Sequence, residues 1–233
     1  TTGRWAGGDL AGFMEAEVAR FQAAYPDGPP MLVYRSAEWA GAMFAQQRNQ
    51  LASQELFLPF ARDCDGFVDY PLDVDESGYD AGLPYCRWDF RRCDTQQAFL
   101  DVVRLAAQGA SAGVFFDGAH GVACDEAQEL SGLDLVARQL FMDAQHVVFR
   151  RAFSDLVHAG KYPVLSTTIG FDGIGAQVPW GNDCPRAEEA LLDALAGVPF
   201  ARNNEFWMWN LGDLASRQIL NAIEEADRGV PTM

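Results

Sequence analysis

The stretch of sequence that decides the fold is residues 112–119, Ala-Gly-Val-Phe-Phe-Asp-Gly-Ala. Its apolar run, residues 114–116, is typical of a buried parallel strand. Asp117 follows at once, and Gly118 lets the backbone turn sharply. An acidic side chain at the C-terminal end of such a strand is well placed for catalysis. The alternative is an aspartate that caps the next turn.

Five other short segments read as strands, and they begin near residues 31, 56, 86, 163 and 198. Helical patterns lie between most of them. Two of the predicted helices begin at an aspartate cap: the first at Asp9, and another at Asp94, with Gln97 in the capping-box position. A long helix is predicted over about 133–159, with Leu140 on its buried stripe. The other predicted helices lie near 40–53, from Pro185 to Gly197 and over about 213–228. This alternation predicts an α/β fold with right-handed crossovers, either a TIM-like (β/α) barrel or an open doubly wound sheet. No GxGxxG or GxxxxGK[ST] motif supports the nucleotide-binding forms of the open sheet.

The strand count, about six to seven, stops short of the eight of a closed barrel. We therefore expect a single domain over residues 1–233 whose barrel is incomplete. The chain could be a fragment of a longer one, or a protein partner could complete the barrel. A strand hidden near 67–72 or 206–210 is the remaining alternative.

Composition excludes several classes of protein. The net charge is −16, with 33 acidic residues against 17 basic ones, so a nucleic-acid phosphate backbone would be repelled. No apolar run approaches the ~20 residues of a membrane span. Five cysteines without a CxxC pair argue against a structural zinc site. Cys124 and Cys184 both follow predicted strands, and a disulfide between them would imply an extracellular or secretory location.

Three stretches, in this order, resemble a group of glycoside hydrolases with TIM-barrel folds. They are Leu-Val-Tyr-Arg-Ser-Ala-Glu at 32–38, Arg-Trp-Asp-Phe-Arg at 87–91 and Gly-Val-Phe-Phe-Asp-Gly-Ala at 113–119. The likeness spans about residues 30–205. It implies carbohydrate chemistry, with a carbohydrate as substrate or ligand, and names no sugar.

Glycosidic cleavage usually needs two carboxyl groups that flank the bond. Asp117 is the first candidate, as nucleophile or base. Glu205 is the second, as the acid, because the apolar residues 206–209 that follow could raise its pKa. The alternative for Glu205 is a loop carboxylate among aromatic side chains that pack the core. For the whole chain, the alternative is a non-catalytic, degenerate barrel that binds glycans or serves as a structural subunit.

Further polar and aromatic residues near strand ends are candidates for substrate binding: Glu38, Arg35, Asp89, His120, Trp180 and Trp207. Arg35 could instead pair with Glu38, Asp89 could pair with Arg87 or Arg91, and Glu38 could be a helix-start charge.

His120 could bond a sugar hydroxyl, and tryptophans such as Trp180 stack well on sugar rings, although core packing is the alternative for any one tryptophan. The acidic segment 73–80 partly resembles a calcium loop. Pro84 stands where a bidentate glutamate belongs, so a solvated acidic loop is the better interpretation. We expect no metal site and no cofactor.

Overall fold

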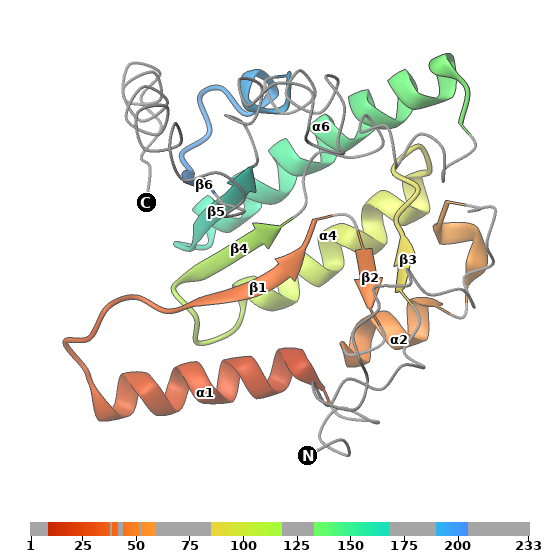
Figure 1. The fold of residues 1–233 in the computed structure, drawn as a ribbon. Helices are drawn as coiled ribbons and strands as arrows, with labels where there is room; N and C mark the ends of the chain where they lie inside the picture. The colour runs from red at the N-terminus through yellow and green to blue at the C-terminus, as the bar shows by residue number, and fades with distance from the viewer. Residues whose placement is uncertain are drawn as a thin grey trace, which may run out of the picture.

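The structure is a computed structural model that describes residues 9–37, 39–41, 44–51, 53–58, 85–117, 133–167 and 190–204. Figure 1 shows the arrangement of its elements. In chain order they are α1 (Leu10–Ala24), β1 (Leu32–Ser36), β2 (Trp39–Gly41), α2 (Ala45–Leu51), the 3-10 helix η2 (Gln54–Leu56), β3 (Tyr85–Arg87), α4 (Cys93–Ala107), β4 (Gly113–Asp117), α6 (Leu135–His158), β5 (Tyr162–Thr167) and β6 (Ala201–Asn204).

The main sheet has the order β1-β4-β5-β6, and each neighbouring pair is parallel. Each later strand joins on the same side of the one before it. A doubly wound sheet would reverse direction at a switch point, and the four described strands contain no such reversal. The predicted α/β fold with a parallel sheet is confirmed.

Two of the predicted parallel strands are wrong. Residues 85–87 form β3, which pairs antiparallel with β2 in a separate two-stranded sheet. The other strand was predicted to begin near residue 56, but Leu56 is the last residue of η2. Phe57, which follows it, makes only an isolated antiparallel bridge with Trp88. Phe57 and Trp88 pack against each other, with ring centroids 5.1 Å apart, and Trp88 also packs on Phe99 of α4. Apolar residues buried in this way give the same sequence pattern as a strand of the main sheet. β1 therefore pairs directly with β4.

Four details of the predicted helices are also wrong. The helix expected near 40–53 begins only at Ala45, since residues 39–41 are β2. The Asp94 carboxylate does not cap α4, which begins at Cys93; it binds Arg92 and the backbone N–H of Thr95. Gln97 bonds Asp101 one turn on and forms no capping box. Leu140 of α6 is 58% exposed, because the buried stripe of that helix runs through its neighbour Phe141.

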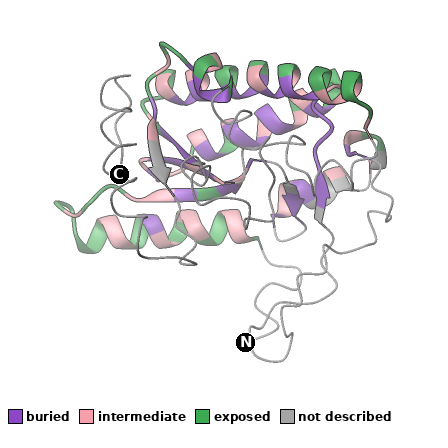
Figure 2. Cartoon of the chain, turned by 45° about the horizontal axis from the view of Figure 1, so that its top comes forward, coloured by how far each residue is buried: buried purple, intermediate pink, exposed green. Residues whose placement is uncertain are grey.

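The hydrophobic core lies between one face of the main sheet and helices α4 and α6. Phe116 is fully buried there, with its ring centroid 5.2 Å from that of Phe153 and 6.0 Å from that of Phe149. Phe99 of α4 completes the contact at 6.4 Å. Figure 2 shows that the buried residues of α6 face inward, whereas its outer side is exposed. Phe99 and Val103 are among the buried residues of α4.

The N-terminal ends of the strands are fastened by polar contacts and by one close approach. Glu15 of α1 accepts hydrogen bonds from the backbone N–H and hydroxyl of Ser111, just before β4. The Lys161 ammonium, just before β5, donates to the Gly109 and Ser111 carbonyls. A Cβ on Gly113 would lie 2.0 Å from the Tyr162 carbonyl oxygen, so only glycine lets β4 and β5 meet at this point.

Candidate active site at the C-terminal edge of the sheet

The register of the four parallel strands aligns residues in rows across the sheet. One row contains Tyr34, Phe115, Val164 and Ala201. Two residues further along, Ser36 pairs with Asp117 and Ser166 pairs with Asn203. The β4–β5 register, which pairs Phe116 with Leu165, aligns Asp117 with Ser166 when it is carried one residue further, so these four residues form the next row. Because alternate residues of a strand share a face, both rows belong to one side of the sheet. The sequence of this side therefore changes from mainly apolar to wholly polar at the C-terminal edge.

The side of the sheet that carries Asp117 is the side away from α4 and α6. Phe116 packs against those helices, so its neighbours Phe115 and Asp117 point the other way. Asp117 is half-buried, and Ser166 in the same row is 3% exposed. The predicted carboxylate thus lies at the C-terminal end of a parallel strand, on the face away from α4 and α6.

The Asp117 carboxylate accepts a hydrogen bond from a neighbouring strand. The Tyr34 hydroxyl of β1 donates to Asp117 Oδ2 at 3.1 Å. The Asp117 backbone is fixed as well, because its carbonyl accepts from Ala37 N at 2.7 Å. Among the residues that the structure describes, no backbone N–H donates to the carboxylate, so the contact seen here is between strands.

Tyr34 was not among the residues that the sequence analysis selected. Its ring stacks on Phe115, with centroids 6.4 Å apart and an interplanar angle of 29°. The side chain is 38% exposed. One sequence feature could have pointed to Tyr34: it lies in the first of the three stretches that resemble glycoside hydrolases. Its contact with Asp117 depends on the pairing of β1 with β4.

Arg35 lies on the opposite side of the sheet from Asp117. It is 4% exposed, its guanidinium carbon is 5.2 Å from the Phe44 ring centroid, and its Nη1 donates to the Tyr34 carbonyl. Burial lowers the pKa of Arg35, and the charges of Glu15 and Asp9 partly oppose this. The structure does not bring Arg35 and Asp117 together.

A pocket of about 210 Å³ opens beside Arg35, on the helix side of the sheet. Residues from α1, α2 and α4 line it, among them Asp9, Glu15 and Gln47. Glu15 is already bonded to Ser111, and the Asp9 carboxylate caps α1 by accepting from Ala11 N. The polar groups of the pocket therefore serve the local structure.

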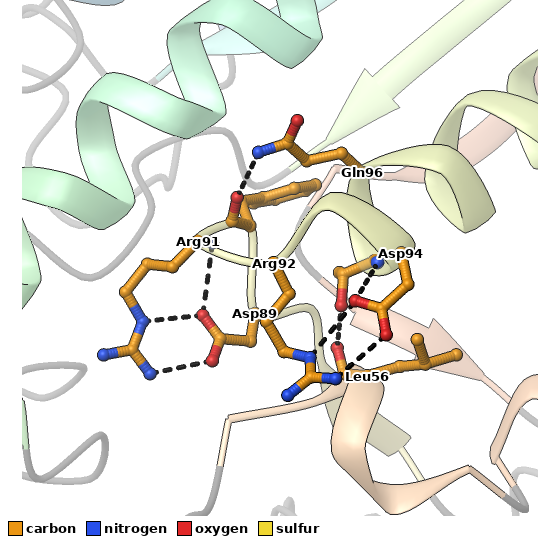
Figure 3. Close-up of polar contacts among 8 residues, drawn as sticks. Leu56, Asp89, Arg91, Arg92, Asp94 and Gln96 are labelled. Carbon is orange, nitrogen blue, oxygen red and sulfur yellow. Dashed lines mark hydrogen bonds and ion pairs between the residues drawn. The ribbon is translucent and has the colours of Figure 1, made fainter.

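Asp89 is engaged with Arg91 in a two-point ion pair, as Figure 3 shows. The Arg91 Nε and Nη2 atoms donate to the two carboxylate oxygens at 2.8 and 2.7 Å. This hydrogen bonding raises the pKa of Arg91. Asp89 is 5% exposed, and the same turn is held to α4 by the Gln96 amide, which donates to the Phe90 carbonyl at 2.8 Å. Asp89 was a candidate for substrate binding or for an ion pair with Arg87 or Arg91. The geometry matches the ion pair with Arg91.

The other predicted site residues lie outside the described residues: Glu205, Glu38, His120, Trp180 and Trp207. The acidic segment 73–80 and the cysteines Cys124 and Cys184 lie outside them too. Glu205 directly follows Asn204, the last residue of β6.

The described residues include neither a cluster of potential metal ligands nor a helix suited to crossing a membrane. They contain no group of three or more His, Cys, Asp or Glu side chains that could hold a metal ion. Within the same ranges, no helix has both the length and the apolar character needed to cross a membrane.

Comparisons with known proteins give a fold and no family. No family model matches the chain, and no curated protein matches it. The glycoside hydrolase domain of PelA from Pseudomonas aeruginosa is similar, with a TM-score of 0.54 and 14% sequence identity over 96% of this chain and 72% of that one. The chain has a glycoside hydrolase-like fold. A variant of the PelA domain gives the same values, and Ega3 from Aspergillus fumigatus in complex with galactosamine has a TM-score of 0.39 at 14% identity, over 94% of this chain and 78% of that one.

Proposed function

We propose that the chain is a glycoside hydrolase-like enzyme that cleaves glycosidic bonds by paired-carboxylate acid/base catalysis. Asp117 is the nucleophile or base, and Glu205 is the acid. The observation that carries the proposal is the position of Asp117: it ends a parallel strand of a glycoside hydrolase-like fold, on the face away from the helices, with its carboxylate bonded to Tyr34. Such strand ends are where barrel enzymes hold their catalytic groups.

The spacing of the strands suits a pair of carboxyl groups. β5 alone separates β4 from β6, and two strand spacings amount to about 10 Å. Glycosidase carboxyl groups lie roughly 5–10 Å apart, and side chains at neighbouring strand ends can lean toward each other. We therefore propose that Glu205, which directly follows β6 in the sequence, lies within this range of Asp117.

The chemistry consumes one water molecule for each bond cleaved. The acid, Glu205, donates a proton to the leaving glycosidic oxygen as the bond to the anomeric carbon breaks. The Asp117 carboxylate either attacks that carbon and is later displaced by water, or takes the proton of the attacking water directly. In both cases the anomeric carbon gains the water hydroxyl and the leaving oxygen gains a proton. On the covalent route the Glu205 carboxylate takes the proton of the displacing water and is restored; on the direct route Asp117 ends protonated and Glu205 deprotonated, and proton exchange with solvent restores both.

Neutral or weakly charged glycans fit the surroundings of Asp117. Ser36 and Ser166 flank Asp117 in its row, and hydroxyl groups suit sugar hydroxyls. The net charge of −16 disfavours polyanionic substrates. Within the same proposal, Glu38, His120, Trp180 and Trp207 add hydrogen bonds and stacking surfaces for the sugar, and no cofactor takes part.

The proposal includes closure of the sheet into a barrel. β1 and β6 are the outer strands of the described sheet, and an open edge presents unpaired backbone groups. We propose that residues 1–233 form a single, incomplete TIM-like barrel domain, which further segments of a longer chain or a protein partner complete. An extracellular or secretory location would suit a glycan substrate.

Asp117→Asn tests this function against a matched control. The purified protein, Asp117→Asn and Asp27→Asn are incubated with a panel of neutral and amino-sugar polysaccharides, and new reducing ends are counted. Asp27 is exposed at the other end of β1, so its variant removes the same charge away from the site. We expect Asp117→Asn to lose about 10³-fold or more in turnover and Asp27→Asn to lose none. Equal turnover of all three proteins refutes the role of Asp117, and glycan binding without cleavage by the unaltered chain favours the non-catalytic alternative.

A further inference from the structure

The hydrogen bond between Tyr34 and Asp117 joins two strands at the level of the candidate site. Tyr34 pairs with Phe115, so it lies on β1 two residues short of the Asp117 row. Diagonal positions of this kind are about 8 Å apart at their Cα atoms. The tyrosine side chain is long enough for its hydroxyl to cross this separation and reach Asp117 while its ring remains in the apolar row. The observed 3.1 Å contact is thus set by side-chain length together with strand register.

The ring of Tyr34 is itself held in place. It stacks on Phe115, and its β1 backbone is paired with β4 throughout Leu32–Ser36. The hydroxyl is therefore presented from a rigid base, and the Asp117 carboxylate receives its hydrogen bond from a fixed direction. Aspartate is free to rotate about χ2 in the absence of such a bond.

The two carboxylate oxygens of Asp117 consequently differ. Oδ2 accepts from Tyr34, whereas Oδ1 accepts no hydrogen bond from any residue that the structure describes. A carboxylate that attacks a carbon, or takes a proton from water, needs one oxygen directed at the reacting atom with the other held back. The asymmetry seen here provides that arrangement.

We propose that Tyr34 is a positioning residue that fixes the Asp117 carboxylate by holding Oδ2 and leaves Oδ1 to face the substrate. The inference rests on the proposed function for its kinetic consequence, and on the structure alone for the orientation of the carboxylate. Tyr34 is 38% exposed in the folded protein, so folding removes little of its contact with water. In the unfolded chain, water satisfies its hydroxyl almost as well as Asp117 does. The bond therefore contributes mainly to orientation and little to stability.

Tyr34→Phe removes the hydroxyl and keeps the ring on Phe115. On the glycan that the unaltered protein cleaves, we expect kcat to fall about 10- to 100-fold, the range for loss of a hydrogen bond to a charged group. KM should change less than about threefold and Tm should stay within about 2 °C. Tyr162→Phe is the matched control, since Tyr162 is an exposed tyrosine at the N-terminal end of β5, the strand on the other side of β4, and its kcat should not change. An unchanged kcat in Tyr34→Phe, or a loss that Tyr162→Phe reproduces, overturns the proposal.

A crystal structure of Tyr34→Phe tests the orientation without any substrate. We expect the Asp117 carboxylate to occupy more than one χ2 orientation in the variant and a single one in the unaltered protein. A single, unchanged orientation in the variant overturns the proposal. If the unaltered protein cleaves no glycan in the panel, the proposed function fails, and this crystallographic comparison still decides the role of Tyr34.

Discussion

Gln145 is a buried amide whose replacement should make the protein more stable. It lies on α6 between Phe141 and Phe149 and is fully buried. Neither its Oε1 nor its Nε2 has a hydrogen-bond partner among the residues that the structure describes. A buried amide left unsatisfied costs about 1–3 kcal/mol. Gln145→Met removes both polar atoms and replaces them with an unbranched, adaptable chain of similar length.

The expected gain is smaller than the full penalty because the new side chain will not pack perfectly. Allowing up to about 1 kcal/mol for imperfect packing, we expect the free energy of unfolding to rise by about 1–2 kcal/mol. For a chain of this size this raises Tm by about 2–8 °C. Urea unfolding with an unchanged m-value, together with calorimetry, measures both quantities.

Gln139→Met is the matched control on the same helix. Gln139 is exposed, and its Nε2 donates to Asp143 Oδ1 at 2.8 Å, so its replacement should change stability by less than about 0.5 kcal/mol. If Gln145→Met lowers the free energy of unfolding by more than about 1 kcal/mol, the amide is satisfied in solution and the reasoning is wrong.

Three further perturbations test other parts of the structure. In urea unfolding, Gly113→Ala should destabilise the protein by about 3 kcal/mol or more because the new Cβ meets the β5 backbone. Gly160→Ala is the control: Gly160 has φ 72° and open space around it, so the variant should cost about 1 kcal/mol. Equal costs for the two variants would show that β4 and β5 do not approach closely at Gly113. Burial lowers the pKa of His146 below its ordinary 6.5 despite the opposing charge of Asp143, so the unfolded chain takes up the proton first and stability should fall as the pH drops below about 6.5. His146→Gln should flatten the dependence of Tm on pH between 7.5 and 5, and an unaltered slope would contradict this. Asp89→Asn should cost about 1–2 kcal/mol through its pair with Arg91 and leave glycan cleavage intact; loss of cleavage at full stability would instead assign Asp89 to the substrate.

The parts of the fold that the sequence predicts well are those in which local pattern and burial agree. The run 114–116 followed by Asp117 is a parallel strand, and its alternation determines that Phe116 faces the helices while Asp117 faces away. The Asp9 cap of α1 has the expected hydrogen bond to Ala11 N. In these places the residues that decide the structure are neighbours in the chain.

The parts that the sequence did not predict depend on pairing between distant segments. The apolar run at 56–58 is buried like a strand of the main sheet, yet it packs on Trp88 outside that sheet. Arg35 was expected near the substrate, and the β1–β4 register turns it to the helix side. The same register brings Tyr34 to Asp117, and no local pattern around either residue indicates that contact.

A crystal structure of Asp117→Asn with the oligosaccharide that the unaltered protein cleaves tests the central claim most directly. The account predicts that the scissile linkage lies over the row that contains Ser36, position 117 and Ser166, with the anomeric carbon within about 4 Å of the carboxamide or one water molecule away from it. An oligosaccharide bound in the pocket beside Arg35, or with its linkage more than about 10 Å from position 117, would contradict it.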